Sequence, residues 1–257
     1  MNTRAEKLLD NIKKCVKEIF AQELVGVYVH GSLAFGCFHW DRSDIDFLIV
    51  TESVPTQAQK EQLIREMLYL DEEAPSKGME MSVLTRENCR HFVHPMPFEL
   101  HWSNFHKENF LRDLSGYCHY MQGEDPDLAA HVAVTKAVGF ALCGEPIDEV
   151  FAEVPKAAYV DSIRCDLAGC LTEIEKAPHY YIPNLCRALA YAEENLILSK
   201  EQGLRWAAER LPKRWEYLLQ KVLECHYLGT VFGCEQDRET VKVFAEELLR
   251  CLKKAGI

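Results

Sequence analysis

The chain lacks the features that mark several other classes of protein. None of its eleven cysteines forms a C-x-x-C pair, and the nearest two are Cys165 and Cys170, so a structural zinc site is not expected. No run of apolar residues approaches the roughly 18 positions of a membrane-spanning helix. The first residues, MNTRAEKLLDNIKK, contain no apolar signal core. We therefore expect a cytoplasmic protein without a membrane partner, whose cysteines are reduced and mostly buried.

An excess of basic residues is also missing. The chain has 29 Lys and Arg against 40 Asp and Glu, a net charge of −11, which argues against nucleic acid as a partner. Residues 1–157 hold 25 acids and 15 bases, a balance of −10, whereas residues 158–257 hold 15 and 14, a balance of −1. The acidic half is either an ordinary solvated surface or a field that attracts a cationic substrate.

The patterns that are present predict an α+β protein of two domains. Apolar periodicity over the 257 residues, 48% of them hydrophobic, predicts both element types. Strands and helices mix before about residue 150 and helices dominate afterwards, with a proline and the change of charge near residues 154–156. We expect domains at 1–156 and 157–257, with a ligand site between them. The expected helices are 4–22, 56–70, 127–142 and the segments from about 159 onward, and the expected strands are 25–31, 45–50, 79–85 and 98–102.

Two short motifs carry most of the chemical information. His30-Gly31-Ser32 ends an apolar strand, and Ser43-Asp44-Ile45-Asp46 leads into the next one. Side chains alternate along a strand, so Asp44 and Asp46 point to the same side. Mg²⁺ binds one or two carboxylates together with phosphate oxygens, and a Gly-Ser turn offers backbone N–H groups and a hydroxyl to phosphates. The alternative is a pair of turn and cap residues, but acids are poor strand residues. We interpret the motifs as a metal–nucleotide site.

Transfer of a phosphoryl group to an alcohol also needs a base that removes the proton. Glu80 is the leading candidate, because it alternates with apolar neighbours in MEMSV, and Glu99 in FELHW has the same pattern. Either residue could simply face water. Glu72 and Glu73 lie in a polar segment and are expected to be solvated.

Four histidines, His91, His94, His101 and His106, lie within one short segment. They could form a transition-metal site. The apolar residues among them favour a partly buried loop and strand instead.

The two motifs together resemble the Gly-Ser…Asp-x-Asp signature of the nucleotidyltransferase superfamily, whose fold is like that of DNA polymerase beta. More of the chain is similar to one branch, the aminoglycoside adenylyltransferases that act on streptomycin and spectinomycin. The similar segments occur in the same order along nearly the full length and are Asp125-Pro126-Asp127-Leu128-Ala129, Thr135-Lys136, Gly144, Trp206-Ala207, Glu209-Arg210-Leu211-Pro212 and Tyr227-Leu228-Gly229. The resemblance implies a nucleotidyltransferase domain with a mixed sheet, followed by an all-α domain.

The resemblance also implies roles for individual residues. The chain would be an Mg²⁺-dependent adenylyltransferase with ATP as co-substrate, and Glu80, rather than Glu99, would be the third metal ligand and general base. Two cations facing a triphosphate are chemically sensible, since Mg²⁺ does not neutralise all of its charge. The remaining implied positions are Asp44 and Asp46 for the metal, Gly31, Ser32 and Ser43 for the phosphates, Arg187 and Lys200 for the triphosphate, and Tyr227 near the nucleotide.

The chain departs from its relatives where the acceptor would bind. The streptomycin-modifying members have a tryptophan and an acid in a loop that here is Glu173–Tyr181, which contains neither Trp nor Asp, and Phe105 stands for another tryptophan. We therefore expect a small cationic acceptor with a hydroxyl group, spectinomycin rather than streptomycin, and a monomer would suffice. The alternatives are a nucleotide-binding regulatory or antitoxin-type protein, and an adenylyltransferase with a non-antibiotic or protein acceptor.

Overall fold

The computed structural model describes residues 3–228, 230, 232 and 238–257. The chain forms two compact units, Met1–Tyr159 (unit 1) and Val160–Ile257 (unit 2). Helix α9 (Lys156–Asp166) begins at the predicted domain boundary and continues across this division. Within the described part of the chain, no helix is long and apolar enough to cross a membrane.

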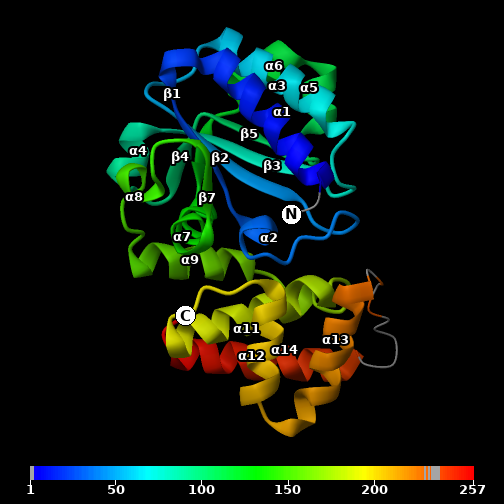
Figure 1. Ribbon diagram of the computed structural model, residues 1–257. Coiled ribbons are helices and arrows are strands. Elements are labelled where there is room, and N and C mark those ends of the chain that lie inside the picture. Colours follow the sequence, from blue (N-terminus) through cyan, green and yellow to red (C-terminus); the bar gives the residue numbers. More distant parts are fainter. Residues whose placement is uncertain (1–2, 229, 231, 233–237) are drawn as a thin grey trace. The chain divides into compact units, whose positions relative to one another are not determined.

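Unit 1 is built on a mixed five-stranded sheet (Figure 1) in the order β5-β3-β2-β1-β7. Strands β2 and β3 are parallel, and the other neighbours are antiparallel. A second small sheet pairs β4 with β6. The strands are β1 (Leu24–Val29), β2 (Ile45–Thr51), β3 (Met79–Thr85), β4 (Met96–Phe98), β5 (Leu100–Trp102), β6 (Gly123–Asp125) and β7 (Phe140–Gly144).

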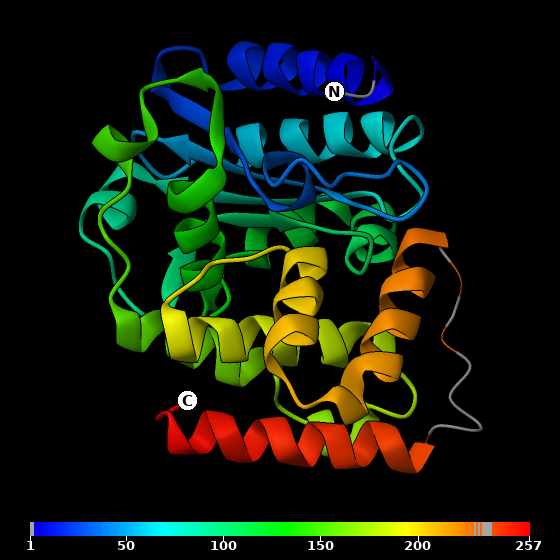
Figure 2. The ribbon, with the colours of Figure 1, turned by 60° about the horizontal axis from the view of Figure 1, so that its bottom comes forward.

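One face of the main sheet packs against α1 (Thr3–Phe20) and α3 (Gln57–Asp71), which Figures 1 and 2 show on the same side. Alternate strand residues such as Ile45, Phe47 and Ile49 point into this core and are buried. Because α1 presents an apolar stripe at helical spacing, burial of that stripe stabilises the helix against the sheet.

The opposite face is covered by shorter helices. Leu48 and Val50 of β2 pack there in a second core with Leu128 and Val132 of α7 (Leu128–Val138). Asp46 precedes them at the same alternation, so it belongs to the face on which α7 lies. The other helical segments of unit 1 are η1 (Ala21–Glu23), α2 (Gly31–Ala34), α4 (Arg86–Arg90), α5 (Lys107–Arg112), α6 (Leu114–Tyr120) and α8 (Ile147–Val150).

Two predictions about local structure were wrong. The expected helix over 127–142 ends at Val138, and Phe140–Gly144 instead forms β7, antiparallel to β1. Gly139 is extended and ends the helix, and pairing with a distant strand is not visible in a short apolar run. The expected strand over 98–102 is interrupted at Glu99, so that β4 ends at Phe98 and β5 begins at Leu100. The Glu99 N–H donates to the Val83 carbonyl oxygen at 2.8 Å.

In the described part of unit 2 all the regular elements are helices, as expected. Its core includes Ile182, Leu185, Leu204, Trp215 and Phe244. The helices besides α9 are α10 (Cys170–Glu173), α11 (Pro178–Glu194), α12 (Lys200–Arg210), η2 (Lys213–Trp215), α13 (Glu216–Leu228) and α14 (Arg238–Lys254). The mixed sheet followed by these helices confirms the predicted α+β class.

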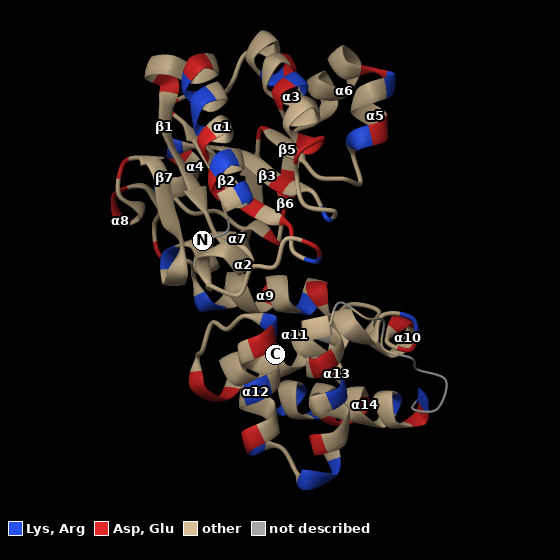
Figure 3. Cartoon of the chain, turned by 45° about the vertical axis from the view of Figure 1, so that its right-hand side comes forward, with Lys and Arg blue, Asp and Glu red and all other residues tan. Residues whose placement is uncertain are grey.

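Acidic and basic residues are interspersed along the outer helices of each unit (Figure 3). In α3, for example, Arg65 pairs with Glu61 one turn away at 3.0 Å. Such exposed pairs contribute little to stability and are typical of a solvated surface. Among the cysteines that the structure describes, five are buried, and they are free thiols: Cys15, Cys89, Cys118, Cys170 and Cys186.

Candidate active site

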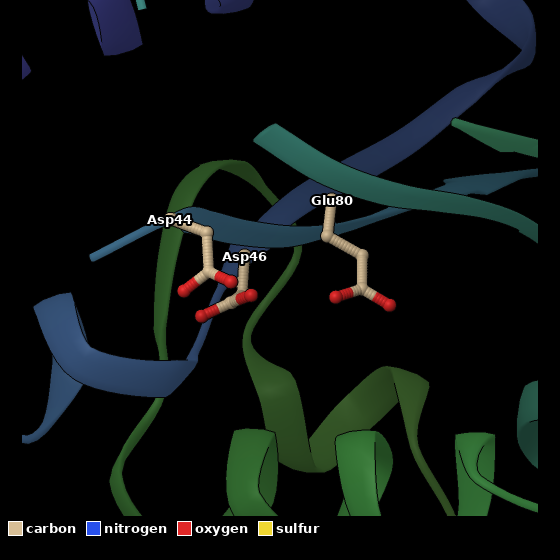
Figure 4. A group of neighbouring side chains, drawn as sticks. All are labelled: Asp44, Asp46 and Glu80. Atoms are coloured by element: carbon tan, nitrogen blue, oxygen red, sulfur yellow. The ribbon is translucent and has the colours of Figure 1, made fainter. Parts of the chain in front are cut away.

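Three carboxylates meet at one end of the parallel strand pair. Asp46 of β2 is directly opposite Glu80 of β3, and Asp44 lies two positions before Asp46 on the same side. One oxygen from each of Asp44, Asp46 and Glu80 can be chosen so that all three lie within 4.8 Å of one another. Figure 4 shows the three side chains pointing to the same side of the strands. Half-buried carboxylates this close repel one another, so the arrangement favours a bound cation.

The turn after β1 closes tightly over Asp46. The His30 N–H donates to the Asp46 carbonyl oxygen at 3.0 Å, which carries the β1–β2 pairing into the turn. Gly31 has a φ of +59°, and a Cβ at this position would lie 1.8 Å from Asp46 Oδ2. Only glycine can therefore occupy this position without moving the carboxylate.

The two serines of the motifs have different surroundings. The Ser32 Oγ is buried and has no hydrogen-bond partner among the described residues. The Ser43 Oγ accepts from the His39 N–H at 3.1 Å and so helps to hold the loop before Asp44. A buried hydroxyl without a partner is uncommon. Ser32 directly follows Gly31, which lies against Asp46, so a phosphate oxygen at this turn could accept from the Ser32 hydroxyl.

The electrostatics of the site involve a histidine that the sequence reasoning missed. Burial raises the pKa of Glu80, His131 opposes this shift, and Asp44 adds to it. Burial alone would lower the pKa of His131, but its hydrogen bond with Asp127 and the charges of Asp127, Glu80 and Asp46 raise it to about 10. The acidic groups around His131 therefore favour its protonated form.

His131 had a weak signal in the sequence. Asp127 and His131 are spaced i,i+4 at the start of α7, and their side chains pair at 3.3 Å. The segment was interpreted only as a helix similar to one in the family.

The rival glutamate lies elsewhere. Glu99 faces Lys60 of α3, with Nζ and Oε2 3.7 Å apart, and both side chains are largely buried. Lys60 also donates to Gln122 at 3.4 Å. Glu99 therefore pairs with the helix on the other face of the sheet, and the structure brings Glu80, not Glu99, to Asp44 and Asp46.

The histidine-rich segment forms a packed network. His101 Nδ1 and Ser82 Oγ are 3.0 Å apart, and His106 Nδ1 and Tyr117 Oη are 2.7 Å apart. Burial, helped by the charge of His106, lowers the pKa of His101 to about 4. Among the described residues, the only cluster of at least three potential metal ligands is Asp44, Asp46 and Glu80.

Arg187 lies in α11 of unit 2. One of its terminal nitrogens donates to Asn184 Oδ1 at 2.7 Å, whereas its Nε is buried without a partner in the described part of the chain. Gly203 of α12 lies against its stem, and a Cβ there would be 2.7 Å from Arg187 Cγ. The close approach of the two helices thus fixes the position of this guanidinium.

Lys200 and Tyr227 also have contacts within unit 2. Lys200 Nζ lies 5.6 Å from the centre of the Tyr180 ring. The Tyr227 hydroxyl accepts from Arg205 at 2.5 Å and donates to Glu201. The roles of Arg187, Lys200 and Tyr227 at a nucleotide stay predictions, and Gly229 of the Tyr227-Leu228-Gly229 motif lies outside the described residues.

The expected acceptor loop over 173–181 is shorter than predicted. α10 ends at Glu173 and α11 begins at Pro178, because proline fits the first turn of a helix. Glu173 pairs with Lys176 at 3.0 Å. The second acidic residue of this segment, Glu175, pairs with Lys242 of α14. In unit 1, the Phe105 side chain is 84% exposed.

Two family models match the chain in the order that its architecture requires. The nucleotidyltransferase domain matches residues 9–101, and the C-terminal domain of aminoglycoside adenylyltransferase matches residues 149–250. The spectinomycin 9-adenylyltransferase of Staphylococcus aureus (strain Mu50) is 24% identical over 210 residues, 80% of this chain and 79% of that protein. The Campylobacter jejuni protein of the same name is 22% identical over 250 residues, 96% and 93% of the two chains.

The fold has a close counterpart among solved structures. The crystal structure of spectinomycin adenyltransferase AAD(9) from Enterococcus faecialis with ATP and spectinomycin superposes with a TM-score of 0.78, at 20% identity, covering 96% of this chain and 99% of that one. The matches span both units and include the strands that carry Asp46 and Glu80. The chain belongs to the aminoglycoside adenylyltransferase family and is a nucleotidyltransferase.

Proposed function

We propose that this protein transfers AMP from ATP to a hydroxyl group of spectinomycin or a closely related aminocyclitol and releases pyrophosphate. The observation that carries the proposal is the convergence of Asp44, Asp46 and Glu80 beside the Gly31-Ser32 turn in a chain of this family. A protein that only bound nucleotide would have no use for a third carboxylate as a base.

The residues present fit Mg²⁺ and a nucleotide. The three carboxylates supply the hard oxygen ligands that Mg²⁺ prefers. Because Gly31 has no Cβ, the Asp46 carboxylate can lie directly against the turn, and the Ser32 hydroxyl lacks a partner among the described residues. When bound, Mg²⁺ neutralises charge on the phosphates and on the leaving pyrophosphate. Asp44, Asp46 and Glu80 would hold it.

Glu80 acts as the general base. It takes the proton of the acceptor hydroxyl while that oxygen forms a bond to the α-phosphorus and the bond from the α-phosphorus to the bridging oxygen of pyrophosphate breaks. Ser32 donates to the phosphates, and Ser43, anchored to His39, keeps Asp44 in place. The chain thus contributes mainly position and charge, which are the main needs of phosphoryl transfer.

Unit 2 supplies the remaining contacts in this proposal. Arg187 and Lys200 bind the triphosphate, and Tyr227 lies near the nucleotide. Arg187 supports this role, because its Nε is buried and has no partner among the described residues. An arginine fixed by helix packing suits a planar, bidentate contact to phosphate.

The choice of acceptor rests on two points: the sequence differences from the streptomycin-modifying members of the family, and the names of the similar proteins. The segment 173–181 contains no tryptophan and no aspartate, and the relatives and the solved structure are named for spectinomycin. Phe105 offers an exposed ring to a cationic acceptor.

The test is pyrophosphate release from MgATP by the purified full chain, with spectinomycin and streptomycin as acceptors. We expect turnover with spectinomycin and little with streptomycin. In E80Q, turnover falls by about 10²–10⁴-fold, because the base is lost, while ATP still binds. The matched control is E99Q, which changes the rival glutamate and keeps an oxygen for Lys60; its turnover stays near that of the wild type.

No turnover with any alcohol despite tight MgATP binding would contradict the enzymatic proposal and favour a regulatory binder. AMP label on a protein in lysate, without label on spectinomycin, would favour a protein acceptor. Equal losses in E80Q and E99Q would remove the assignment of the base to Glu80.

A further inference from the structure

The exposed ring of Phe105 rests on side chains that are anchored to the core of unit 1. Phe105 is 84% exposed, and its ring meets the His106 ring edge to face, with centres 5.1 Å apart and planes at 88°. His106 Nδ1 is 2.7 Å from Tyr117 Oη, and the Tyr117 ring packs on the buried Phe110 ring at 4.8 Å. An exposed aromatic side chain usually has several rotamers available, so contact with an anchored ring restricts it.

Residues 103–106 form a turn that begins beside Glu80. Strands β3 and β5 are antiparallel, so the last residue of β5 lies beside the beginning of β3. In this register Ser82 is paired with His101, and Ser82 Oγ is 3.0 Å from His101 Nδ1. Paired residues point to the same side of a sheet, and Ser82 follows Glu80 at the same alternation, so His101 lies on the carboxylate face. The His101 ring in turn meets the His106 ring, with centres 5.4 Å apart.

The turn has a second anchor on the other side of Glu80. Asn104 Nδ2 donates to the Lys77 carbonyl oxygen at 2.9 Å. Gly78 allows this close approach, because a Cβ there would lie 2.5 Å from Asn104 Oδ1. The carbonyl oxygen of Gly78 also accepts from the N–H of the first residue of β2 at 3.2 Å. The turn is thus attached to the chain both before and after Glu80, and one of these attachments is shared with the strand of the aspartates.

His106 is suited to lie next to a ring that binds a cation. Burial lowers the pKa of His106, so its imidazole is neutral near neutral pH. The face of the Phe105 ring attracts a cation, and a neutral neighbour does not oppose that attraction.

We propose that Asn104 and His106 are positioning residues for the acceptor: they fix the Phe105 ring relative to Glu80, so that an acceptor bound on this ring presents its hydroxyl to the base. The inference rests on the proposed function and on its use of Phe105 as an acceptor contact. Because the ring is ordered before the acceptor arrives, binding of the acceptor does not bear the cost of ordering it. The advantage belongs to the KM for the acceptor and not to the binding of ATP.

The test is pyrophosphate release by the full chain, with spectinomycin varied at saturating MgATP and MgATP varied at saturating spectinomycin. H106A should raise the KM for spectinomycin about fivefold and leave kcat and the KM for ATP within about twofold of the wild type. N104A, which removes the second anchor, should raise the KM for spectinomycin about threefold.

The chain offers a matched control in α6. The His119 ring meets the exposed Tyr120 ring with nearly the same geometry, centres 5.0 Å apart and planes at 84°. H119A therefore removes an equivalent contact with an exposed ring away from the 103–106 turn. Its KM for spectinomycin should equal that of the wild type.

Two further substitutions of His106 separate its ring from its hydrogen bond. H106F keeps a ring against Phe105 and loses the bond to Tyr117, so it should melt at a lower temperature and keep the KM for spectinomycin within about twofold of the wild type. H106Q keeps a polar group for Tyr117 and loses the ring, so its KM for spectinomycin should rise about as much as in H106A.

A double-mutant cycle shows whether His106 acts through Phe105. F105A should raise the KM for spectinomycin about tenfold, and adding H106A should have no further effect, because the ring that His106 positions is already absent. If H106A does not fold, the same cycle with N104A carries the test, since Asn104 is exposed.

An unchanged KM for spectinomycin in both H106A and N104A would show that the network only stabilises the turn, and would overturn the inference. A further rise on adding H106A to F105A would overturn it as well. Absence of turnover with spectinomycin in the wild type would overturn the proposed function and this inference together, whereas the other two outcomes leave the proposed function intact.

Discussion

The two faces of the unit 1 sheet have different tasks, and neighbouring residues of one strand divide them. Phe47 and Ile49 of β2 point into an apolar core under α1 and α3. Asp46 and Leu48 point to the opposite face. Leu48 belongs to the second apolar core there, and Asp46 lies with the other two carboxylates at one end of the strand. Because side chains alternate, a charged site can be built on one face without placing a charge in the core of the other.

The largest expected effect tests this division at adjacent positions. D46N removes a proposed metal ligand and should lower turnover on the order of a thousandfold, while the free energy of unfolding in metal-free buffer falls by no more than about 1 kcal/mol. F47A empties a fully buried position and should lower the free energy of unfolding by about 3–5 kcal/mol. Turnover per folded molecule should change little in F47A. Pyrophosphate release and urea denaturation measure the two quantities.

A large loss of turnover in folded F47A, or a loss of stability in D46N as large as in F47A, would mean that the two faces are coupled. Stability and catalysis would then not be separable between adjacent residues of β2.

The next effect sharpens the comparison at a glycine. G31A places a methyl group 1.8 Å from Asp46 Oδ2 and should lower turnover on the order of a hundredfold, because the Asp46 carboxylate, the proposed metal ligand, is displaced. The matched control is G36A: Gly36 also has a positive φ, +73°, but a Cβ there has no heavy atom within 4 Å. G36A should cost about 1–2 kcal/mol of stability from backbone strain and keep its turnover. Similar losses of turnover in the two variants would show that strain, not the contact with Asp46, is responsible.

The local part of this site could be predicted from the sequence. Alternation along one strand places Asp44 and Asp46 on the same side, and a glycine before a serine after an apolar strand indicates a tight turn. These patterns extend over a few residues, so no long-range information is needed. The apolar stripe of α1 was found for the same reason.

What the sequence could not supply depends on pairing between distant segments. The pattern around Glu80 matches that around Glu99, and only the parallel register of β2 with β3 places one opposite Asp46, whereas the other meets Lys60. The expected helix over 127–142 ran into the first residues of β7, because the partner strand of β7, β1, lies more than a hundred residues earlier. His131 was missed because its acidic neighbours, apart from Asp127, come from other elements.

The smallest expected effect extends the comparison to unit 2, where α11, like β2, carries core residues next to a residue with a proposed role in the site. Leu185 and Cys186 are buried in the helical core, and Arg187 follows them against α12. G203A adds a methyl group 2.7 Å from Arg187 Cγ, so the arginine stem must shift. We expect the KM for ATP to rise roughly threefold with little change in kcat, since the loss is one of binding rather than of the reacting groups.

A double-mutant cycle shows whether G203A acts through Arg187. R187A should raise the KM for ATP by more than G203A, and adding G203A to R187A should then have no further effect, because the displaced side chain is already absent. If the effects of the two substitutions on the KM for ATP instead multiply, the methyl group disturbs the packing of α11 against α12 in general. Arg187 would then lose the feature that distinguishes it from an ordinary helix-surface charge, namely that its position is fixed by the neighbouring helix.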